Sequence, residues 1–428
     1  MRHGCILRAG SSQHTTRAAG GGRGASVHFA IVGAGPAGAA LGYLLARAGG
    51  EVTLLERQTD FAREFRGEVL MPSGLDAIAQ MGLGAALDAL PQRTVARVAL
   101  YQDAQPLFDL PLVIGGPRAV SQPSLLEMLV REAGKWPGFR LERGFTVRDL
   151  LTRDGVVVGV RGDSANGPRE VAADWVIGAD GRASSVRKHS CLDRERPTQV
   201  FDIVWCRIPL LPAHADQARL YLGQGHFAIV IPAPDGRLQI GWVIEKGTFG
   251  ELRKRGVSDW LGELARTVSP DLGRHIEANR DAVSHPFLLD VVCDHIDDWS
   301  APGLLLLGDA AHPMSPVAAQ GINIALRDAL VAANHLAPLA ARPADPGELL
   351  AACQRINRER LPEVKVIQRL QSVPPRFMFQ RTVATRFAVR RLLPALARWG
   401  VLPLVIGIAA HRFLFGTTEV RLHTRSTT

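Results

Sequence analysis

The chain has 428 residues, 46% of them hydrophobic, and a formal net charge of +9 from 50 Lys and Arg against 41 Asp and Glu. This composition excludes a wholly disordered chain and is typical of two or three domains with a sizeable core. The five cysteines are scattered, with no C-x-x-C pair and no zinc-ligand spacing, so we expect no metal site and a reduced, cytoplasmic protein.

The N-terminal residues 1–26 mix Gly, Ser and Arg and lack the apolar stretch of a signal peptide, so we expect a disordered leader. The longest uncharged apolar run, Trp399 to Ala410, is shorter than the roughly 18–20 residues that span a bilayer. We therefore expect no transmembrane anchor.

The first ordered stretch predicts a strand, a glycine turn, a helix and a second strand over residues 27–57. Its turn reads G-x-G-x-x-G, and an acidic residue closes the second strand about 20 residues later, the pattern of a dinucleotide site. The glycines would allow the tight turn, the approach of a pyrophosphate and close helix packing, while the acid would accept a hydrogen bond from a ribose hydroxyl. The candidate cofactor-binding residues here are Gly33, Gly35, Pro36, Ala37, Gly38, Glu56 and Arg57.

Beyond this unit the hydrophobic period changes several times along the chain. Helical periodicity is expected at 71–83, 124–134, 258–278, 321–337 and most of 346–428. Alternation or short apolar runs predict strands at 95–121, 145–162, 174–178, 226–232 and 238–245, with hairpin turns at Asp154-Gly155 and Asp235-Gly236.

We interpret this order as an α/β protein with a Rossmann-type dinucleotide-binding domain, which the motifs below assign to FAD by resemblance, a sheet-rich α+β substrate domain and a helical C-terminal segment. The dinucleotide-binding domain is expected to be discontinuous. It would comprise residues 27–95, 120–190 and 287–345, the substrate domain 96–119 and 191–286, and the C-terminal segment 346–428.

Two further motifs follow predicted strands. Gly178-Ala179-Asp180-Gly181 resembles the "DG" motif of the group A flavoprotein monooxygenases, the para-hydroxybenzoate hydroxylase-like family. The stretch Gly308-Asp309-Ala310-Ala311-His312-Pro313, continuing through Pro316 to Gln320-Gly321-Ile322-Asn323, resembles that family's "GD" motif. With the glycine turn, three motifs occur in the family's order, and the resemblance covers residues 27–345.

The resemblance implies roles for several residues. Asp309 would accept from a ribityl hydroxyl, and the amides around Gly321 and Ile322 would face the flavin pyrimidine edge. Asp180 would contribute to FAD and NAD(P)H binding, although it also fits a turn residue, and His312 fits a structural role as well as acid–base work. Candidates by position in the family's motifs are Arg66 and Gln122 near the FAD phosphate or ribityl chain, together with Gly308, Pro316 and Asn323. No catalytic side chain is assigned.

The implied activity is that of an FAD-dependent monooxygenase, in which NAD(P)H reduces FAD, O₂ forms a C4a-hydroperoxyflavin, and a hydrophobic, aromatic small molecule is hydroxylated or epoxidised. The alternative is a dehydrogenase or reductase of the same superfamily, resembling geranylgeranyl reductase. A halogenase lacks support, because the W-x-W-x-I-P signature is absent and the nearest segment is GWVIEK. A flavin-binding interaction protein without turnover is the non-enzyme alternative.

Two features leave alternatives open. Phe227, Ile229, Ile231, Ile240 and Trp242 fit either a substrate pocket or ordinary sheet-face core. From Lys365 onward the chain holds eleven Lys or Arg and one acid, Glu419, interleaved with large apolar residues. This basic segment fits either helices packed on the FAD domain or peripheral contact with an anionic membrane, and no nucleic-acid-binding module accompanies the charge.

Overall fold

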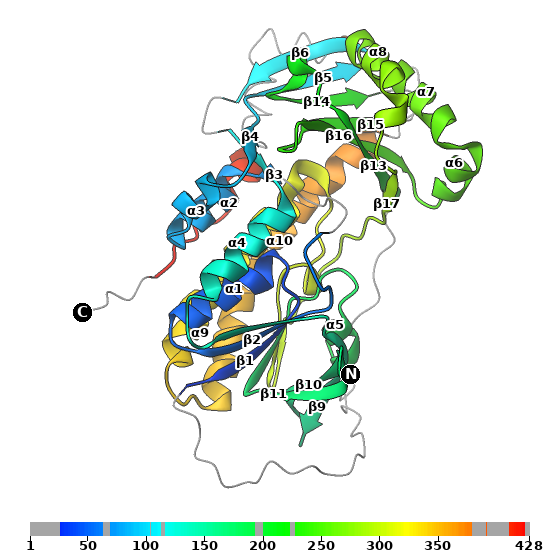
Figure 1. The fold of residues 1–428 in the computed structure, drawn as a ribbon. Helices are drawn as coiled ribbons and strands as arrows, with labels where there is room; N and C mark the ends of the chain where they lie inside the picture. Colours follow the sequence, from blue (N-terminus) through cyan, green and yellow to red (C-terminus); the bar gives the residue numbers. More distant parts are fainter. Residues whose placement is uncertain are drawn as a thin grey trace.

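The computed structural model describes residues 26–62, 69–102, 104–112, 116–192, 200–222, 227–378, 391 and 411–423. Two sheet-based units lie end to end along the molecule, and helix α10 (Pro346–Met378) runs along the larger one toward the smaller one (Figure 1). The predicted α/β class is confirmed, because helices pack on a mostly parallel sheet in the larger unit.

The larger unit is built on a six-stranded sheet of order β18-β19-β12-β1-β2-β8 in which only β18 is antiparallel to its neighbour. The strands are β1 (His28–Val32), β2 (Glu51–Glu56), β8 (Phe139–Arg143), β12 (Trp175–Gly178), β18 (Ser300–Ala301) and β19 (Leu304–Leu306). The central strands are nearly continuous apolar runs, as expected for a parallel sheet covered on both faces. Because these strands are parallel, their carboxyl ends meet at one edge of the sheet.

Helices cover one face of this sheet and a β-meander covers the other (Figure 1). The helices are α1 (Pro36–Arg47), α4 (Gln122–Ala133) and α9 (Gln320–Ala340), with α10 packed on α9, and the meander is β9 (Thr146–Arg153), β10 (Val156–Ser164) and β11 (Gly167–Ala172). The hairpin predicted at Asp154-Gly155 joins β9 to β10. The short helix α5 (Ser185–His189) follows β12.

The smaller unit is a seven-stranded sheet of order β17-β13-β16-β15-β14-β5-β6. Its strands are β5 (Arg97–Gln102), β6 (Gln105–Pro111), β13 (Phe201–Pro209), β14 (Gln217–Leu222), β15 (Phe227–Pro232), β16 (Arg237–Glu245) and β17 (Phe287–Leu289). Helices α6 (Phe249–Arg255), α7 (Val257–Thr267) and α8 (Pro270–Ala278) belong to this unit, and α7 and α8 cover its outer face. Strand β17 pairs with β13, although we expected residues from 287 onward to lie in the FAD-binding domain.

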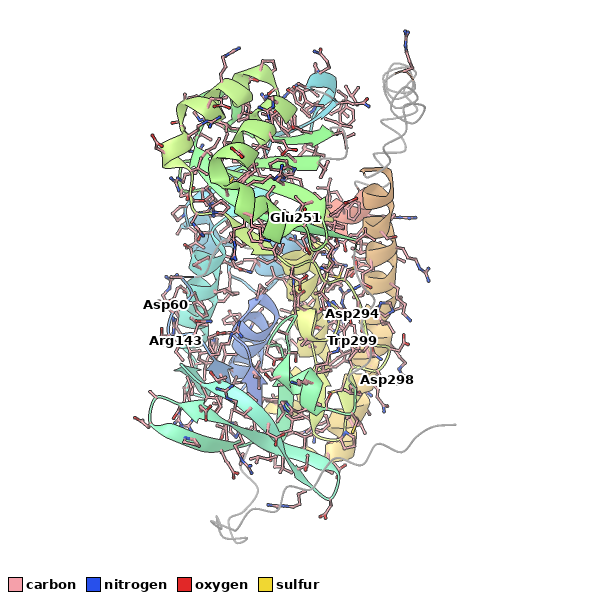
Figure 2. The ribbon with its side chains drawn as sticks, turned by 90° about the vertical axis from the view of Figure 1, so that its right-hand side faces the viewer. Asp60, Arg143, Glu251, Asp294, Asp298 and Trp299 are labelled. Carbon is pink, nitrogen blue, oxygen red and sulfur yellow. The ribbon has the colours of Figure 1, made fainter. Side chains whose placement is uncertain are left out.

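Two connecting regions lie between the larger and the smaller unit. A small sheet of β3 (Val69–Leu70), β7 (Arg118–Val120) and β4 (Gln92–Thr94) lies with α2 (Pro72–Gln80) and α3 (Gly84–Asp88) on one side of the molecule. On the other side the segment carrying Asp294 and Trp299 runs beside α10 (Figure 2). It is held there by Gln368 Nε2, which donates to the Asp294 carbonyl oxygen at 2.6 Å.

The end of the chain returns to the larger unit. Residues 411–415 are helical and 416–423 are not, so the expected C-terminal helical segment is helical only in part where it is described. Gln80 Nε2 donates to the Val420 carbonyl oxygen at 3.0 Å, and Asn334 Nδ2 donates to that of Arg421 at 2.7 Å. These bonds attach the tail to α2 and α9. Among the described residues, no helix combines the length and hydrophobicity needed to cross a bilayer.

Three cysteines in the described part of the chain are free thiols: Cys206, Cys293 and Cys353. Burial raises the pKa of the Cys206 thiol to about 12, which makes it unreactive.

Candidate active site

The turn between β1 and α1 is built on three glycines with different steric demands. Gly33 has a φ of +100°, and a Cβ there would lie 2.5 Å from the Ala179 carbonyl oxygen. A Cβ at Gly38 would overlap the Gly33 carbonyl oxygen, so this glycine lets α1 pack against the strand. A Cβ at Gly35 would meet nothing closer than the Ala179 oxygen at 4.0 Å. The open space lies where a pyrophosphate would approach the turn.

Helix α1 begins at this open space without a side-chain cap. Gly35 is the N-cap residue and Pro36, whose fixed φ suits the first helical position, comes next. The amides of the first turn have no intrahelical acceptor, so that of Ala37 is left for a ligand or water. The uncapped end of α1 therefore fits the pyrophosphate of a dinucleotide.

Glu56 ends β2 beside this turn and is 3% exposed. Its Oε2 accepts from the Ala34 amide at 2.9 Å and its Oε1 accepts from the Gln58 amide at 3.0 Å. The carboxylate thus lies where the glycine turn and β2 meet, as the spacing predicts for an acid that binds ribose. Arg57, the next residue, is exposed.

The other two motifs reach the same sheet edge, because β12 lies between β1 and β19. Gly308 and Asp309 follow β19 in a 3₁₀ turn, and Arg182 Nε lies 3.2 Å from Asp309 Oδ2. Both side chains are partly exposed, at 25% for Arg182 and 28% for Asp309. A carboxylate is thus available at the carboxyl end of a buried strand, where a ribityl hydroxyl would need an acceptor.

Asp180 has a different environment within the same edge. Its carboxylate accepts from Ser184 Oγ at 2.5 Å and from the Ser185 and Val186 amides at 2.6 and 3.1 Å. Burial raises the pKa of Asp180 despite these hydrogen bonds. The side chain caps α5, which is the turn role left open above, while its role toward FAD or NAD(P)H stays a prediction.

The loop before α9, residues 313–319, has a strained backbone. Ala318 and Ala319 both adopt the left-handed conformation, with φ values of 57° and 49°. Each such non-glycine residue costs on the order of 1–3 kcal/mol, and such residues gather at functional sites. Pro316 enters the loop, and α9 begins after it with no side-chain cap, which leaves the amides of Gly321 and Ile322 free to stabilise a ligand's negative charge.

Three further residues were predicted to bind the cofactor: Asn323, Gln122 and Arg66. Asn323 is fully buried, its Oδ1 accepts from the Met71 amide at 2.8 Å, and its Nδ2 donates to the Val69 carbonyl oxygen at 3.1 Å. Asn323 therefore ties α9 to β3 and α2. Gln122 is the first residue of α4 and is partly exposed, and its side chain makes no hydrogen bond with another described residue. Arg66 lies outside the described residues.

His312 is buried together with Asp328 of α9 and Arg360 of α10. Its Nε2 lies 2.8 Å from Asp328 Oδ2, and its ring centroid lies 4.8 Å from that of Trp299. Asp328 also pairs with Arg360 at 2.8 Å. Burial alone would raise the pKa of Asp328, but His312 and Arg360 hold it below its usual range. This environment favours the structural role for His312.

Apolar residues cover the inner face of the seven-stranded sheet, which is turned toward the larger unit. Its buried members and Val317, from the loop before α9, form one cluster. Trp205 on β13 pairs with Gly241, and a Cβ at Gly241 would lie 2.7 Å from the Trp205 ring. The Trp205 ring therefore lies flat over Gly241. The cluster comprises Phe201, Ile203, Trp205, Phe227, Val243, Phe287, Leu289 and Val291.

The five residues proposed for a pocket divide between the two faces of this sheet. Phe227 and Ile229 lie on the inner face, and Ile231 shares it by alternation. Ile240 and Trp242 lie on the outer face, where Trp242 packs 5.6 Å from Trp260 of α7. For these two residues the ordinary core interpretation holds.

Three comparisons identify this arrangement. The model of a family described as "FAD binding domain" matches residues 26–362. The chain belongs to this family, that of the group A flavoprotein monooxygenases. It is an FAD-dependent monooxygenase, for which NAD(P)H is the typical reductant of the family.

Among curated relatives, the chain is 32% identical to 6-methylpretetramide 4-monooxygenase of Streptomyces rimosus over 86% of this chain and 92% of the relative. It is 30% identical to 3-amino-4-hydroxybenzoate 2-monooxygenase PtmB3 of Streptomyces platensis, over 80% of this chain and 86% of the relative. Squalene monooxygenase SE2 of Panax ginseng is 28% identical, with 74% of this chain and 59% of the relative aligned. These names do not favour the reductase alternative.

Solved structures show the same fold. PqsL of Pseudomonas aeruginosa in complex with 2-aminobenzoylacetate aligns with a TM-score of 0.73 and 24% identity, over 85% of this chain and 99% of PqsL. The p-nitrophenol 4-monooxygenase PnpA of Pseudomonas putida aligns with a TM-score of 0.76 and 18% identity, over 92% of this chain and 98% of PnpA.

Sequence reasoning missed several residues of this region. Arg182 follows the second motif directly, but its pairing with Asp309 depends on β12 and β19 being neighbours. Trp205 could have been found from the alternation of large residues along 201–209. Gln368 and Gln371 are three residues apart, a spacing that places them on one face of α10.

Proposed function

We propose that this monooxygenase hydroxylates an aromatic ring that binds against the inner face of the seven-stranded sheet, beside the loop before α9. The observation that carries the proposal is the flat Trp205 ring over Gly241, in the same apolar cluster as Val317. An aromatic side chain laid parallel to a sheet offers a stacking surface for a planar substrate. Phe201, Phe227 and Phe287 add further aromatic area to this face.

The names of relatives support an aromatic substrate. PtmB3 is named for an amino-hydroxybenzoate, and PqsL was solved with 2-aminobenzoylacetate. The squalene monooxygenases are named for a substrate without a ring, but the chain spans only 59% of the length of SE2. Epoxidation of an isoprenoid chain is therefore the alternative outcome of the test below.

The chain's own residues supply binding and orientation. When bound, FAD takes electrons from NAD(P)H and activates O₂ for transfer of one oxygen atom. The open turn at Gly35 would hold the pyrophosphate, and Asp309 would accept from the ribityl chain after release from Arg182. The uncapped amides of Gly321 and Ile322 would stabilise negative charge at the pyrimidine edge, and the apolar inner face would exclude water.

Membrane contact through the basic C-terminal residues, like a cytoplasmic location, stays a prediction. Most of that segment, residues 379–390 and 392–410, lies outside the described residues. Co-sedimentation of the holoenzyme with vesicles of anionic and of neutral lipid would test it. Binding to anionic vesicles that is lost at high salt would support peripheral contact, and no binding to either would contradict it.

The substrate proposal is tested with the FAD-loaded protein and a panel of phenols, hydroxybenzoates, polycyclic aromatic ketones and linear isoprenoids. NAD(P)H oxidation, oxygen uptake and product mass are recorded together for each compound. We expect oxidation stimulated by an aromatic compound and a product heavier by one oxygen atom. Stimulation and oxygen transfer with isoprenoids alone would contradict the proposal.

A further inference from the structure

The loop before α9 is held by side-chain amides that come from outside it. Gln371 of α10 donates from Nε2 to the carbonyl oxygens of Ser315 and Val317, both at 2.8 Å. Gln368, one turn earlier, donates to the carbonyl oxygen of Pro313 at 3.1 Å. Helix α10 therefore binds the loop through its carbonyl groups.

Two amides at the start of α9 continue this pattern. Gln320 Nε2 donates to the carbonyl oxygens of Ala318 and of Phe413 in the C-terminal tail, both at 2.8 Å. Asn323 Nδ2 donates to the carbonyl oxygen of Ala319 at 2.7 Å. We call Gln320, Asn323, Gln368 and Gln371 the amide clamp.

The clamp fixes the direction of the loop's amide groups as well. In a planar trans peptide the carbonyl of one residue and the N–H of the next point in opposite directions. Holding the carbonyls of Val317 and Ala319 therefore also fixes the N–H groups of Ala318 and Gln320, each of which points away from the side chain that binds the preceding carbonyl. These two N–H groups come just before the amides of Gly321 and Ile322, which have no side-chain cap at the start of α9.

The loop needs such a restraint. Ala318 and Ala319 are consecutive left-handed residues without a glycine, a conformation that alanine leaves readily unless its surroundings fix it. Gln371 is 1% exposed, and its Oε1 has no hydrogen-bond partner among the described residues. A buried acceptor without a partner lowers the stability of the fold. A glutamine at this position is therefore better explained by the two bonds that its Nε2 donates to the loop than by a contribution to stability.

We propose that Gln371 is a positioning residue for the FAD site: it keeps the loop before α9 in its left-handed conformation and thereby keeps the first amides of α9 directed at the flavin's pyrimidine edge. Gln368 and Gln371 lie beyond residues 26–362, which the family model matches. The inference deepens the FAD site and does not depend on which substrate is bound.

The test uses sulfite and the FAD-loaded enzyme without substrate. Sulfite adds to N5 of oxidised flavin and leaves a negative charge at N1 and the C2 carbonyl, which the α9 amides would stabilise. We expect Gln371→Met to weaken sulfite binding roughly tenfold, because the donors are misdirected rather than removed. This corresponds to a two-electron midpoint potential lower by about 30 mV. Gln354→Met, at an exposed position of the same helix, should keep the parent values.

A second variant separates positioning from general damage. Glycine adopts positive φ without strain, so Ala318→Gly added to Gln371→Met should recover most of the sulfite affinity. Parent-like affinity in Gln371→Met, an equal loss in Gln354→Met, or no recovery with glycine would each overturn the proposal. If Gln371→Met gives no folded holoenzyme, Gln371→Asn is measured instead, since it keeps the amide but shortens its reach. An intermediate loss then supports the proposal and an unchanged affinity overturns it.

Discussion

Replacing Gly241 with alanine should displace the Trp205 ring toward the larger unit. The new Cβ would lie 2.7 Å from two ring carbons, whereas carbon atoms pack at about 3.5–4.0 Å, so the ring must move by about 1 Å. A shift of about 1 Å at a substrate contact can cost up to about 100-fold in rate. We expect kcat/KM for the aromatic substrate to fall by about 10- to 100-fold, with more NAD(P)H oxidised without product.

The assay compares substrate-stimulated NAD(P)H oxidation, product yield, FAD affinity and Tm. Gly250→Ala in α6 is the matched control, because a Cβ at Gly250 meets nothing within 4 Å and the residue is exposed. FAD affinity should stay at the parent value in both variants, since Gly241 lies on the other unit. Unchanged KM and coupling in Gly241→Ala, or the same loss in Gly250→Ala, would refute the assignment of this face to substrate.

Other predictions concern the cofactor and the buried charges. Gly35→Val should weaken FAD binding strongly without lowering the Tm of the apoprotein, because the new side chain would enter the open space at the turn. Gly38→Ala should lower that Tm, because its Cβ would overlap the Gly33 carbonyl oxygen. An FAD titration and thermal melting of the apoprotein distinguish the two variants. Glu363→Gln should cost about 3–5 kcal/mol in chemical unfolding, because it leaves the buried Arg327 without its carboxylate partner and the buried Arg360 with Asp328 alone. Burial would raise the pKa of Glu363, but these two arginines hold it below its ordinary value of 4.5. The stability it contributes is thus complete above that value and lost as pH falls through the folded pKa, so the parent's Tm should drop more steeply in acid than that of Glu363→Gln.

The positions of the candidate cofactor residues in the fold could be predicted because their determinants are local. The glycines at 33, 35 and 38 and the acid at 56 lie within one βαβ unit, where strand, turn and helix fix their positions. Asp309 was predictable for a similar reason, since the end of a buried parallel strand places its side chain at the sheet edge. The local pattern could not predict the hydrogen-bond partners of these residues, such as the serine hydroxyl and the two backbone amides that donate to the Asp180 carboxylate.

The substrate face was harder because it depends on register. In the pairing of β15 with β16, Ile229 faces Gly241, so Ile240 and Trp242 point to the opposite side of the sheet. A shift of one residue reverses every side chain of a strand, and two apolar faces give no signal in the sequence. Gln371 was missed for a different reason: it lies more than 50 residues from the carbonyls it binds, and a buried glutamine in a helix looks like an ordinary polar position.

The central claim is that the protein transfers an oxygen atom from O₂ to an aromatic substrate using FAD. The most direct measurement is turnover of the holoenzyme with NAD(P)H, the best substrate of the panel and isotopically heavy O₂, followed by mass analysis of the product. The account predicts a product that carries one heavy oxygen atom. A product that carries no heavy oxygen, or one reduced at a double bond, would contradict it.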